Sequence, residues 1–475
     1  MALNLRRPVV GILLIAPPRF HDLGAGTESG MYWERKEREA ENIVARFSFA
    51  EKVYPGVVYT REQVERAVQM FRLKKADCIF AHFLSWSDDF AWIRFLRDIG
   101  EDMPILFASI SREQPGFEDS LEEERFIEFL SAGGLVGALE ASGTIARFAR
   151  PLLFTALGRI QVVMEQAESF SKAACLRTEL RQTVFALLPT YNEAMWATYV
   201  DPYDIFMKVG PELHFLTVAE LEDEITQIRR EKTEDVMEKI LRRYPSDKQI
   251  RRDKFFASVE SSLAVESLAR KHHAELVVLN DINPALMNHI GLRPGFSPCT
   301  DADDVMVTPE GDLGGGLACY LLRKLSGCHV SFVEPFYIDE RDGTFAAGHA
   351  GPNDYTDPDG KTIISTDTRF AKSQYKHAGA PFAWNVIGTG EKTMVHVSQC
   401  NGRFKMVCSL VDALETGHFL AGYSHGRFRP RIPVEEFFRK LLEIGVTQHY
   451  GVAGGDFRRE LRIIAKLLDF DYSEI

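Results

Sequence analysis

Four short segments in the second half of the chain each place a carboxylate or an imidazole at an expected turn or element end. The residues concerned are Glu310, Glu334, His349 and His449. Two carboxylates and two neutral imidazoles, with no thiolate, suit a hard to borderline divalent ion such as Mn²⁺, Co²⁺ or Mg²⁺. Four protein ligands leave two octahedral positions open, which is what a vicinal hydroxy-carbonyl group of a sugar needs.

Each carboxylate also has a simpler explanation when it is taken alone. Glu310 lies at an expected strand-to-helix junction, where backbone N–H groups can keep a carboxylate ionised. Glu310 or Asp312 could equally serve only as a helix cap. Glu334 follows an apolar strand expected over residues 330–333 and precedes a proline, so it projects from a strand end, although an ordinary loop carboxylate would give the same pattern.

The histidines differ in how strongly their surroundings indicate a function. His349 lies between a glycine and an alanine and is expected to need room around its ring more than packing. His396 lies inside an alternating strand and is interpreted as structural. His449, beside Tyr450, fits either a metal ligand or a core imidazole with satisfied hydrogen bonds. The four candidate ligands therefore carry more weight as a set than singly.

The motifs around these residues resemble those of a known family. Pro-Glu-Gly-Asp-Leu-Gly-Gly, Val-Glu-Pro, Gly-His-Ala-Gly and Gln-His-Tyr resemble, in order and approximate spacing, the metal-site segments of L-arabinose isomerases, with L-fucose isomerases as more distant kin. The resemblance extends from about residue 285 to about residue 455. It implies that Glu310, Glu334, His349 and His449 hold Mn²⁺, with Co²⁺ or Mg²⁺ as alternatives, and that Glu310 and Glu334 act as acid and base.

The resemblance also implies a reaction and an assembly. The expected activity is metal-dependent aldose–ketose isomerisation of a pentose or related sugar, in which a proton moves between C1 and C2 through an enediolate. The implied assembly is a trimer-based homo-oligomer, a hexamer or a tetramer, with its active site at a subunit interface.

Two other functions stay open on the same residues. One is a different metal-dependent enediolate reaction, by an epimerase or an aldolase, on a sugar or an anionic sugar derivative. The other is a non-catalytic sugar-binding protein. Against the second stands the pair of carboxylates, because they would repel each other in a buried site without a cation.

One segment departs from the arabinose isomerase pattern. The loop after the first strand, where those enzymes carry a Gln-His pair that touches substrate, here contains Arg19. An arginine there predicts substrate binding and favours an anionic or more heavily hydroxylated sugar. Arg427, Arg429 and Arg431 also lie in one short stretch, which is interpreted as a solvated basic loop in preference to a phosphate or sulfonate site.

The elements that would position these residues suggest an α/β chain of three domains. We expect an N-terminal α/β domain over 1–175, a central α/β domain over 176–326 and a β-rich domain over 327–475. Short apolar runs at 9–16, 57–59, 77–82 and 104–110 alternate with amphipathic stretches, which predicts doubly wound α/β domains with parallel sheets. Thr60 and Gln63 predict a capping box, and residues 220–243 and 255–272 predict helices.

The last third of the chain has a different residue pattern. From about residue 327 the runs are short and rich in Thr, Val, Phe and Gly, and Asn401-Gly402 predicts a hairpin turn. We therefore expect a mainly antiparallel β domain with helices over 433–444 and from residue 456. The first strand lacks a following G-x-G-x-x-G motif, which argues against dinucleotide binding.

Composition narrows the class of partner. The net charge of −12 is unfavourable for binding nucleic acid or an anionic membrane surface. The apolar run over 8–16 is too short to cross a bilayer. Seven cysteines without a C-x-x-C pair predict reduced thiols and a cytoplasmic protein.

Overall fold

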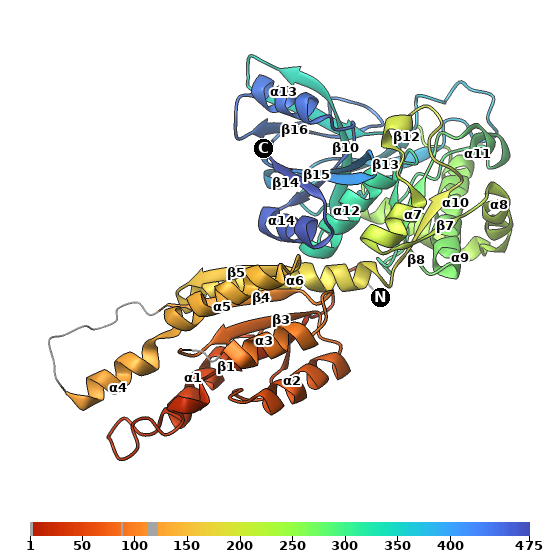
Figure 1. Cartoon of the computed structure of the whole chain (residues 1–475). Coiled ribbons are helices and arrows are strands. Elements are labelled where there is room, and N and C mark those ends of the chain that lie inside the picture. The colour runs from red at the N-terminus through yellow and green to blue at the C-terminus, as the bar shows by residue number, and fades with distance from the viewer. Residues whose placement is uncertain (1–2, 87–88, 112–121) are drawn as a thin grey trace. The chain divides into compact units, whose positions relative to one another are not determined.

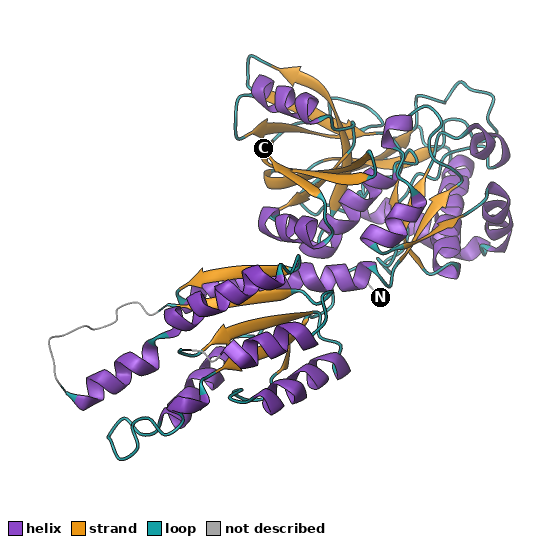
Figure 2. Cartoon of the chain, in the orientation of Figure 1, coloured by secondary structure: helices purple, strands orange, loops and turns teal. Residues whose placement is uncertain are grey.

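The computed structural model describes residues 3–86, 89–111 and 122–475. The chain forms two compact units, one over Arg6–Thr178 and one that combines Met1–Leu5 with Glu179–Ile475. The first unit contains a parallel sheet, and the second contains a parallel sheet followed by mainly antiparallel strands. The α/β elements therefore come first and the antiparallel strands last, as expected (Figures 1 and 2). The expectation of a mixed α/β chain with a C-terminal antiparallel region is confirmed.

The unit Arg6–Thr178 is built on a five-stranded parallel sheet. Its strand order is β2-β1-β3-β4-β5, so the chain leaves β1 first toward one edge and then toward the other. The strands are β1 (Val9–Ile15), β2 (Glu51–Val53), β3 (Cys78–Phe83), β4 (Ile105–Ile110) and β5 (Leu153–Gly158). The helices are α1 (Tyr32–Ala45), α2 (Arg61–Leu73), α3 (Asp89–Asp98), α4 (Glu123–Ala132), α5 (Gly134–Phe148) and α6 (Ile160–Leu180).

Helices cover both faces of this sheet. Apolar side chains of α2, α3 and α5 form one core cluster with one face of the strands. On the other face α6 packs against β5, where the rings of Phe154 and Phe170 lie 5.1 Å apart. Helix α2 begins at the predicted capping box, in which Thr60 accepts from the Gln63 N–H and the Gln63 side chain accepts from the Thr60 N–H. Coverage on both faces explains why the strands are almost wholly apolar.

The second strand lies earlier in the chain than predicted. A strand was expected over 57–59, but β2 is Glu51–Val53, and residues 57–59 contribute only a single bridge between Ile15 and Val58. Pro55 and Gly56 separate the two stretches, and Gly56 has a φ of +92°. Residues 57–59 therefore form a largely buried segment that leads into α2, and the edge strand lies earlier in the chain.

One helical stretch in this unit leaves apolar side chains exposed. The stretch over Glu123–Phe148, formed by α4 and α5, is long and apolar enough to cross a membrane by length and composition alone, and 22% of its most apolar window is buried. Exposed side chains on it include Phe126, Phe129, Leu135 and Leu139. Length and composition are weak evidence here, and the expectation of no membrane partner stays a prediction.

The second unit begins with a four-stranded parallel sheet of order β7-β6-β8-β9. These strands are β6 (Val184–Leu188), β7 (Glu212–Phe215), β8 (Ala274–Leu279) and β9 (Met306–Thr308). The accompanying helices are α7 (Pro202–Asp204), α8 (Val218–Gln227), α9 (Arg230–Arg243), α10 (Arg252–Lys271), α11 (Pro284–His289) and α12 (Leu313–Ser326).

The single helix predicted over 220–243 is two helices. Residue Ile228 has extended backbone angles between α8 and α9, and its side chain packs against both apolar clusters of this region. A continuous helix could not turn this side chain toward both clusters, so tertiary packing overrides the helical charge pattern.

The last part of the chain closes into a six-stranded antiparallel barrel. Its strands follow the order β16-β11-β10-β17-β14-β15, and pairing of β15 with β16 completes the ring. The strands are β10 (Val330–Asp339), β11 (Thr344–His349), β14 (Gly390–Cys400), β15 (Arg403–Leu414), β16 (Ser424–Pro430) and β17 (Tyr450–Gly454). Strands β12 (Lys361–Thr366) and β13 (Pro381–Val386) extend the sheet beyond β16, and β18 (Asp471–Glu474) beyond β15.

Two helices complete the barrel region. Helix α13 (Val434–Ile444) packs into the barrel core, where the ring of Phe345 contacts Phe437 and Phe438. Helix α14 (Arg458–Leu467) follows β17. The predicted hairpin turn is confirmed, since Asn401 and Gly402 both have a positive φ between β14 and β15. The predicted boundary near residue 326 coincides with the end of α12, inside the second unit.

Candidate metal centre

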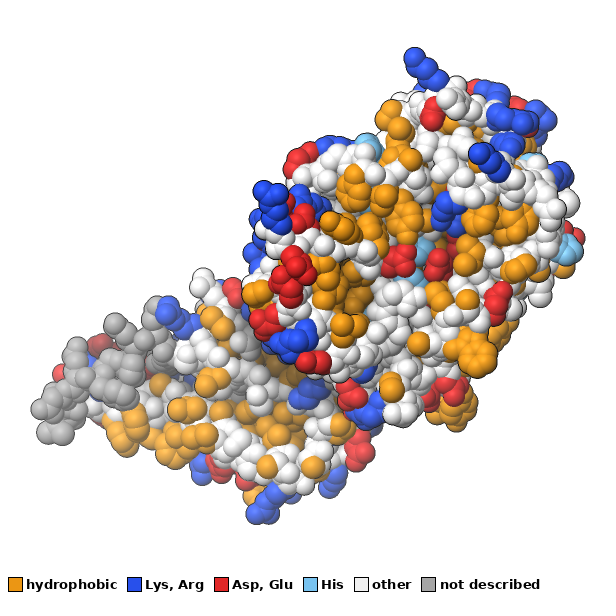
Figure 3. All heavy atoms as spheres, turned by 90° about the horizontal axis from the view of Figure 1, so that it is seen from above, with side chains coloured by type: hydrophobic (Ala, Val, Ile, Leu, Met, Phe, Trp, Pro, Cys, Tyr) orange, Lys and Arg blue, Asp and Glu red, His pale blue; other side chains and the backbone are white. Residues whose placement is uncertain are grey.

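Glu310, His349 and His449 converge where the parallel sheet meets the barrel. Glu310 lies in the turn between β9 and α12, His349 ends β11, and His449 immediately precedes β17. One ligand atom from each residue lies within 4.8 Å of the others. Figure 3 shows acidic and histidine side chains gathered on one face of the molecule, with apolar side chains around them.

The distances within the cluster leave space for an ion. His349 Nε2 lies 3.6 Å from Glu310 Oε1, and His449 Nε2 lies 3.5 Å from Glu310 Oε2. Both distances exceed ordinary N–H···O hydrogen bonds. Two donor atoms that each lie about 2.1 Å from one cation are roughly 3–3.5 Å apart. The three side chains therefore fit the coordination sphere of a single metal ion.

The buried imidazole nitrogens give this interpretation further support. His349 and His449 are 1% and 0% exposed, and neither Nε2 has a hydrogen-bond partner among the described residues. Burying a polar atom without a partner costs about 1–3 kcal/mol. A cation bound by both nitrogens would remove this cost.

His449 is held in the orientation that a metal ligand needs. Its Nδ1 lies 2.8 Å from Asp312 Oδ2, so the ring donates to this carboxylate through Nδ1 and turns Nε2 toward Glu310. Asp312 is itself fixed, because its Oδ1 accepts the Gly315 N–H as the N-cap of α12. One carboxylate thus both begins the helix and orients the histidine.

His349 is positioned by packing. Its ring meets Phe332 edge-on with centroids 5.0 Å apart, and Phe332 also lies 4.6 Å from the ring of His449. Its Nδ1 has no hydrogen-bond partner among the residues that the structure describes. The expectation that His349 needs room more than packing is wrong, since its ring is 1% exposed and packs against Phe332.

The backbone at Glu310 is held in an unusual conformation. Glu310 has a φ of +62°, which costs a non-glycine residue roughly 1 kcal/mol or more. Its N–H donates to Asp281 Oδ1 at 3.0 Å, and Asp281 forms a buried ion pair with Arg293 at 2.9 Å. At the next residue, Gly311, a Cβ atom would lie 2.8 Å from the Asn192 nitrogen. Strain of this kind at a carboxylate is typical of a functional site.

The ionisation of the cluster favours cation binding by Glu310. Burial raises the pKa of Glu310, but the interactions with the His349 and His449 rings outweigh burial and hold the pKa well below its usual range. Burial lowers the pKa of His449, yet Asp312 and Glu310 together raise it to about 9. Without an ion the His449 ring is therefore protonated at neutral pH, and a divalent cation would have to displace that proton.

Glu334 lies beside the cluster but is not one of the three converging residues. It lies within β10, opposite Gly348, and its Oε1 accepts the Tyr423 hydroxyl at 2.5 Å. The Tyr423 ring lies 6.4 Å from that of His349. The expectation that Glu334 ends a strand is wrong, because β10 continues to Asp339 through a bulge that accommodates Pro335.

His396 supports the loop that carries His449. Its Nδ1 donates to the His449 carbonyl at 2.8 Å, and its Nε2 accepts the Thr447 N–H at 3.3 Å. Both ring nitrogens are thus satisfied by backbone. The structural interpretation of His396 agrees with these contacts.

The arginines singled out in the sequence lie elsewhere. Arg19 belongs to the unit Arg6–Thr178, where its guanidinium lies 5.5 Å from the ring centroid of Phe20. Arg427 is in β16 and pairs with Asp339 at 3.1 Å, and Arg431 pairs with Glu391 at 2.8 Å. Two of the three basic side chains in the 427–431 stretch are therefore paired with carboxylates, as expected of a solvated basic segment.

Sequence reasoning missed three contributors to the centre. Asp312 was considered only as a cap, although it stands in the same motif as Glu310. Asp281 follows β8, and its position at the carboxyl end of a parallel strand next to β9 was an available signal. Tyr423 carries no local signal, because only the long-range pairing of β16 with β11 brings the residue before β16 beside His349.

No protein-family model matches this chain, and no curated protein sequence matches it.

Proposed function

We propose that this protein is a metal-dependent aldose–ketose isomerase that acts on a pentose or related sugar through an enediolate. The observation that supports this most is the pair of buried Nε2 atoms, on His349 and His449, that face Glu310 at 3.6 and 3.5 Å without hydrogen-bond partners among the described residues. A cation bound between these side chains would satisfy both nitrogens.

The donor set indicates which cations suit the centre. One carboxylate and two imidazoles, with Glu334 proposed as a fourth ligand, favour Mn²⁺, with Co²⁺ or Mg²⁺ as alternatives. A cation bound there would polarise the carbonyl and hydroxyl oxygens of a sugar and stabilise charge that develops on them.

Proton transfer would fall to the two glutamates. Abstraction of the C2 proton needs a carboxylate within hydrogen-bond reach, and its return to C1 completes the isomerisation without a redox partner. Glu334 is the better placed of the two for this role, because Tyr423 holds one of its oxygens and leaves the other available. Burial and the neighbouring Glu334 raise the pKa of Tyr423, so the phenol stays a hydrogen-bond donor.

The assembly and the sugar remain part of the proposal. The resemblance to L-arabinose isomerases favours a trimer-based homo-oligomer in the cytoplasm, with Arg19 of a neighbouring first domain contacting the substrate. An arginine in that position would select an anionic or heavily hydroxylated sugar.

A carbonyl-shift assay tests the proposal directly. Protein with added Mn²⁺ is incubated with pentoses, hexoses, 6-deoxyhexoses and anionic sugars, and NMR follows ketose formation with and without EDTA. We expect ketose from at least one sugar and none with EDTA. Cleaved or epimerised products would instead support an aldolase or an epimerase, and tight sugar binding without products would support a binding protein.

Variants at two glutamates sharpen the assay. Glu334→Gln should abolish turnover while the protein stays folded, whereas Glu340→Gln, at an exposed position after the same strand, should leave turnover unchanged. Equal activity of both variants would contradict a catalytic role for Glu334.

A further inference from the structure

The end of strand β8 holds the backbone that carries Glu310. The Glu310 N–H donates to Asp281 Oδ1 at 3.0 Å, and the Gly311 N–H donates to the Leu279 carbonyl at 3.2 Å. Leu279 is the last residue of β8, and Asp281 follows two residues later. Two successive N–H groups are therefore held from one place, which is how surrounding structure keeps a residue at an unfavourable positive φ.

Asp281 also lies against the segment that follows His349. Gly351 has a φ of +115°, and a Cβ atom at this position would lie 2.6 Å from Asp281 Oδ2. One carboxylate therefore adjoins the backbone of two segments that carry candidate metal ligands. The third ligand, His449, has separate support, because Asp312 accepts from its Nδ1 at 2.8 Å.

A buried arginine fixes the Asp281 carboxylate. Arg293 Nη1 lies 2.9 Å from Asp281 Oδ2, and Arg293 Nη2 lies 3.1 Å from Asp367 Oδ2. The side chains of Arg293 and Asp281 are only 5% and 0% exposed. Asp367 is anchored in turn, since its Oδ1 accepts from Arg369 Nε at 3.1 Å. Because a guanidinium is planar and rigid, carboxylates on both of its amino groups fix its orientation, and with it the orientation of Asp281.

Stability alone is a weak reason for this buried network. Replacing a buried ion pair by apolar side chains of similar size is often neutral for stability, because desolvation of the two charges offsets their attraction. Here the paired carboxylate has a second contact, since its other oxygen accepts the N–H of Glu310. Arg293 therefore reaches the candidate metal centre through one intervening side chain.

We propose that Arg293 is a positioning residue of the candidate metal centre. By fixing the Asp281 carboxylate, it keeps the Glu310 backbone and the segment after His349 in the geometry that brings both side chains to one cation. The inference rests on the metal centre of the proposed function, and it holds whatever the sugar or the reaction.

The Mn²⁺ affinity of the full chain tests the proposal without any substrate. Electron paramagnetic resonance titration measures free Mn²⁺ in the presence of the unmodified protein, Arg293→Gln and Arg293→Lys. Glutamine removes the charge that fixes Asp281, so affinity should fall about 10- to 100-fold. Lysine keeps a charge but cannot hold both carboxylates with a planar fork, so its loss should be smaller. Unchanged affinity in Arg293→Gln would overturn the proposal.

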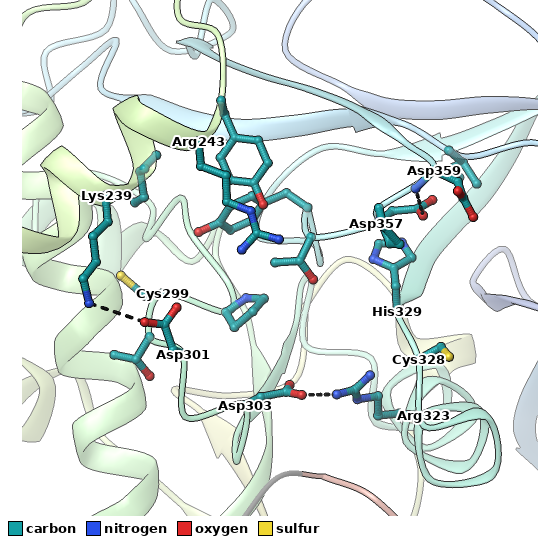
Figure 4. Close-up of a pocket in the computed structure, with 18 of the residues that line it drawn as sticks. Lys239, Arg243, Cys299, Asp301, Asp303, Arg323, Cys328, His329, Asp357 and Asp359 are labelled. Atoms are coloured by element: carbon teal, nitrogen blue, oxygen red, sulfur yellow. Dashed lines mark hydrogen bonds and ion pairs between the residues drawn. The ribbon is translucent and has the colours of Figure 1, made fainter.

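Arg323→Gln is the matched control. Arg323 is also buried, with 8% of its side chain exposed, and Figure 4 shows it paired with Asp303 at the wall of a cavity of about 760 Å³. The described residues that line this cavity include none of the three converging ligands. The cavity adjoins the opposite end of β10, because His329 lines it and Glu334 lies five residues further along, or about 16 Å of strand.

The control separates positioning from general loss of stability. Both Arg293→Gln and Arg323→Gln leave a carboxylate without its arginine, so both should unfold at lower urea concentration. Only Arg293→Gln should lose Mn²⁺ affinity. Equal losses of affinity in the two variants would show a general loosening of the fold and would overturn the proposal.

Asp367→Asn gives a milder form of the test. It leaves Arg293 paired with Asp281 and weakens only the second anchor, so affinity should fall less than in Arg293→Gln. If Arg293→Gln does not fold, Arg293→Lys and Asp367→Asn decide, and Mn²⁺ affinities equal to that of Arg323→Gln would count against the proposal. A lack of Mn²⁺ binding by the unmodified protein would instead overturn the metal centre itself, and this role of Arg293 with it.

Discussion

Strands β10 and β17 present different chemistry at their two ends. At one end His349 and His449 are buried, packed around Phe332 and aimed at a single carboxylate. At the other end a cavity of about 760 Å³ is lined by side chains of both signs, and ion pairs such as Lys239–Asp301 neutralise only part of them. The first end gathers potential metal ligands around one carboxylate, whereas the second mixes cations and carboxylates. One scaffold therefore positions a candidate metal centre at one end of these strands and a cavity of mixed charge at the other.

The largest effect is expected from Glu310→Gln. The amide removes the only anionic member of the three converging side chains, so metal affinity and turnover should both fall, turnover by roughly a thousandfold. Metal content after dialysis and ketose formation report the two effects. Unchanged metal content would show that Glu310 does not bind the metal, and the two strand ends would then no longer differ by a metal centre.

Asp312→Asn should have the next largest effect. Asparagine keeps an oxygen for the Gly315 N–H and therefore keeps the helix cap, but it removes the charge that faces His449 Nδ1. Metal affinity should fall about 10- to 100-fold with little change in unfolding free energy. Metal titration and urea unfolding measure these two effects separately. A large loss of stability with unchanged metal affinity would show that Asp312 acts only as the helix cap.

Tyr423→Phe should affect turnover more than metal binding. Without the phenol, Glu334 loses the hydrogen bond that fixes one of its oxygens, and kcat should fall about 10-fold or more. Metal affinity should change little, because Tyr423 touches none of the three converging side chains through a hydrogen bond in the described structure. Parallel measurement of kcat and metal affinity checks this, and equal losses in both would assign Tyr423 to the metal centre.

The smallest effect concerns the cavity end and its pH dependence. Burial lowers the pKa of His329, but the ion pair with Asp354 at 3.2 Å raises it overall, and the same pair lowers the pKa of Asp354 to about 2 despite burial. The pair should stabilise the fold most between about pH 4 and pH 6.5. Its contribution should be lost as the pH rises through the raised pKa of His329, and lost as the pH falls toward 2.

Urea unfolding of the metal-free protein at several pH values measures this contribution. His329→Gln should abolish the part of the stability loss on the alkaline side that comes from this pair. An unchanged pH profile in the variant would show that the ion pair adds nothing to stability.

Local signals predicted most helices and strands but not the details that tertiary packing decides. The Thr60 capping box, the Asn401-Gly402 hairpin and the buried runs of β1, β3 and β4 depend on neighbours in sequence, and all formed as predicted. The position of β2 and the break at Ile228 depend on which apolar clusters form, which is decided by tertiary packing.

The candidate site shows the same division. Glu310, His349 and His449 were chosen by residue type and motif, and the structure brings their side chains together. The sequence could not predict that Glu334 lies outside the group of three converging side chains. Its position depends on a bulge in β10 and on its hydrogen bond with Tyr423, which immediately precedes β16. The cavity beyond β17 also had no signal, since its walls come from segments more than two hundred residues apart.

The most direct test of the account is to identify the ligands of bound Mn²⁺. Electron spin-echo measurements on protein loaded with a single equivalent of Mn²⁺ detect coordinated imidazole nitrogen. The account predicts couplings from two histidines, of which one disappears in His349→Ala and another in His449→Ala. Bound Mn²⁺ without nitrogen coupling, or couplings unaffected by both substitutions, would contradict a metal centre at Glu310, His349 and His449.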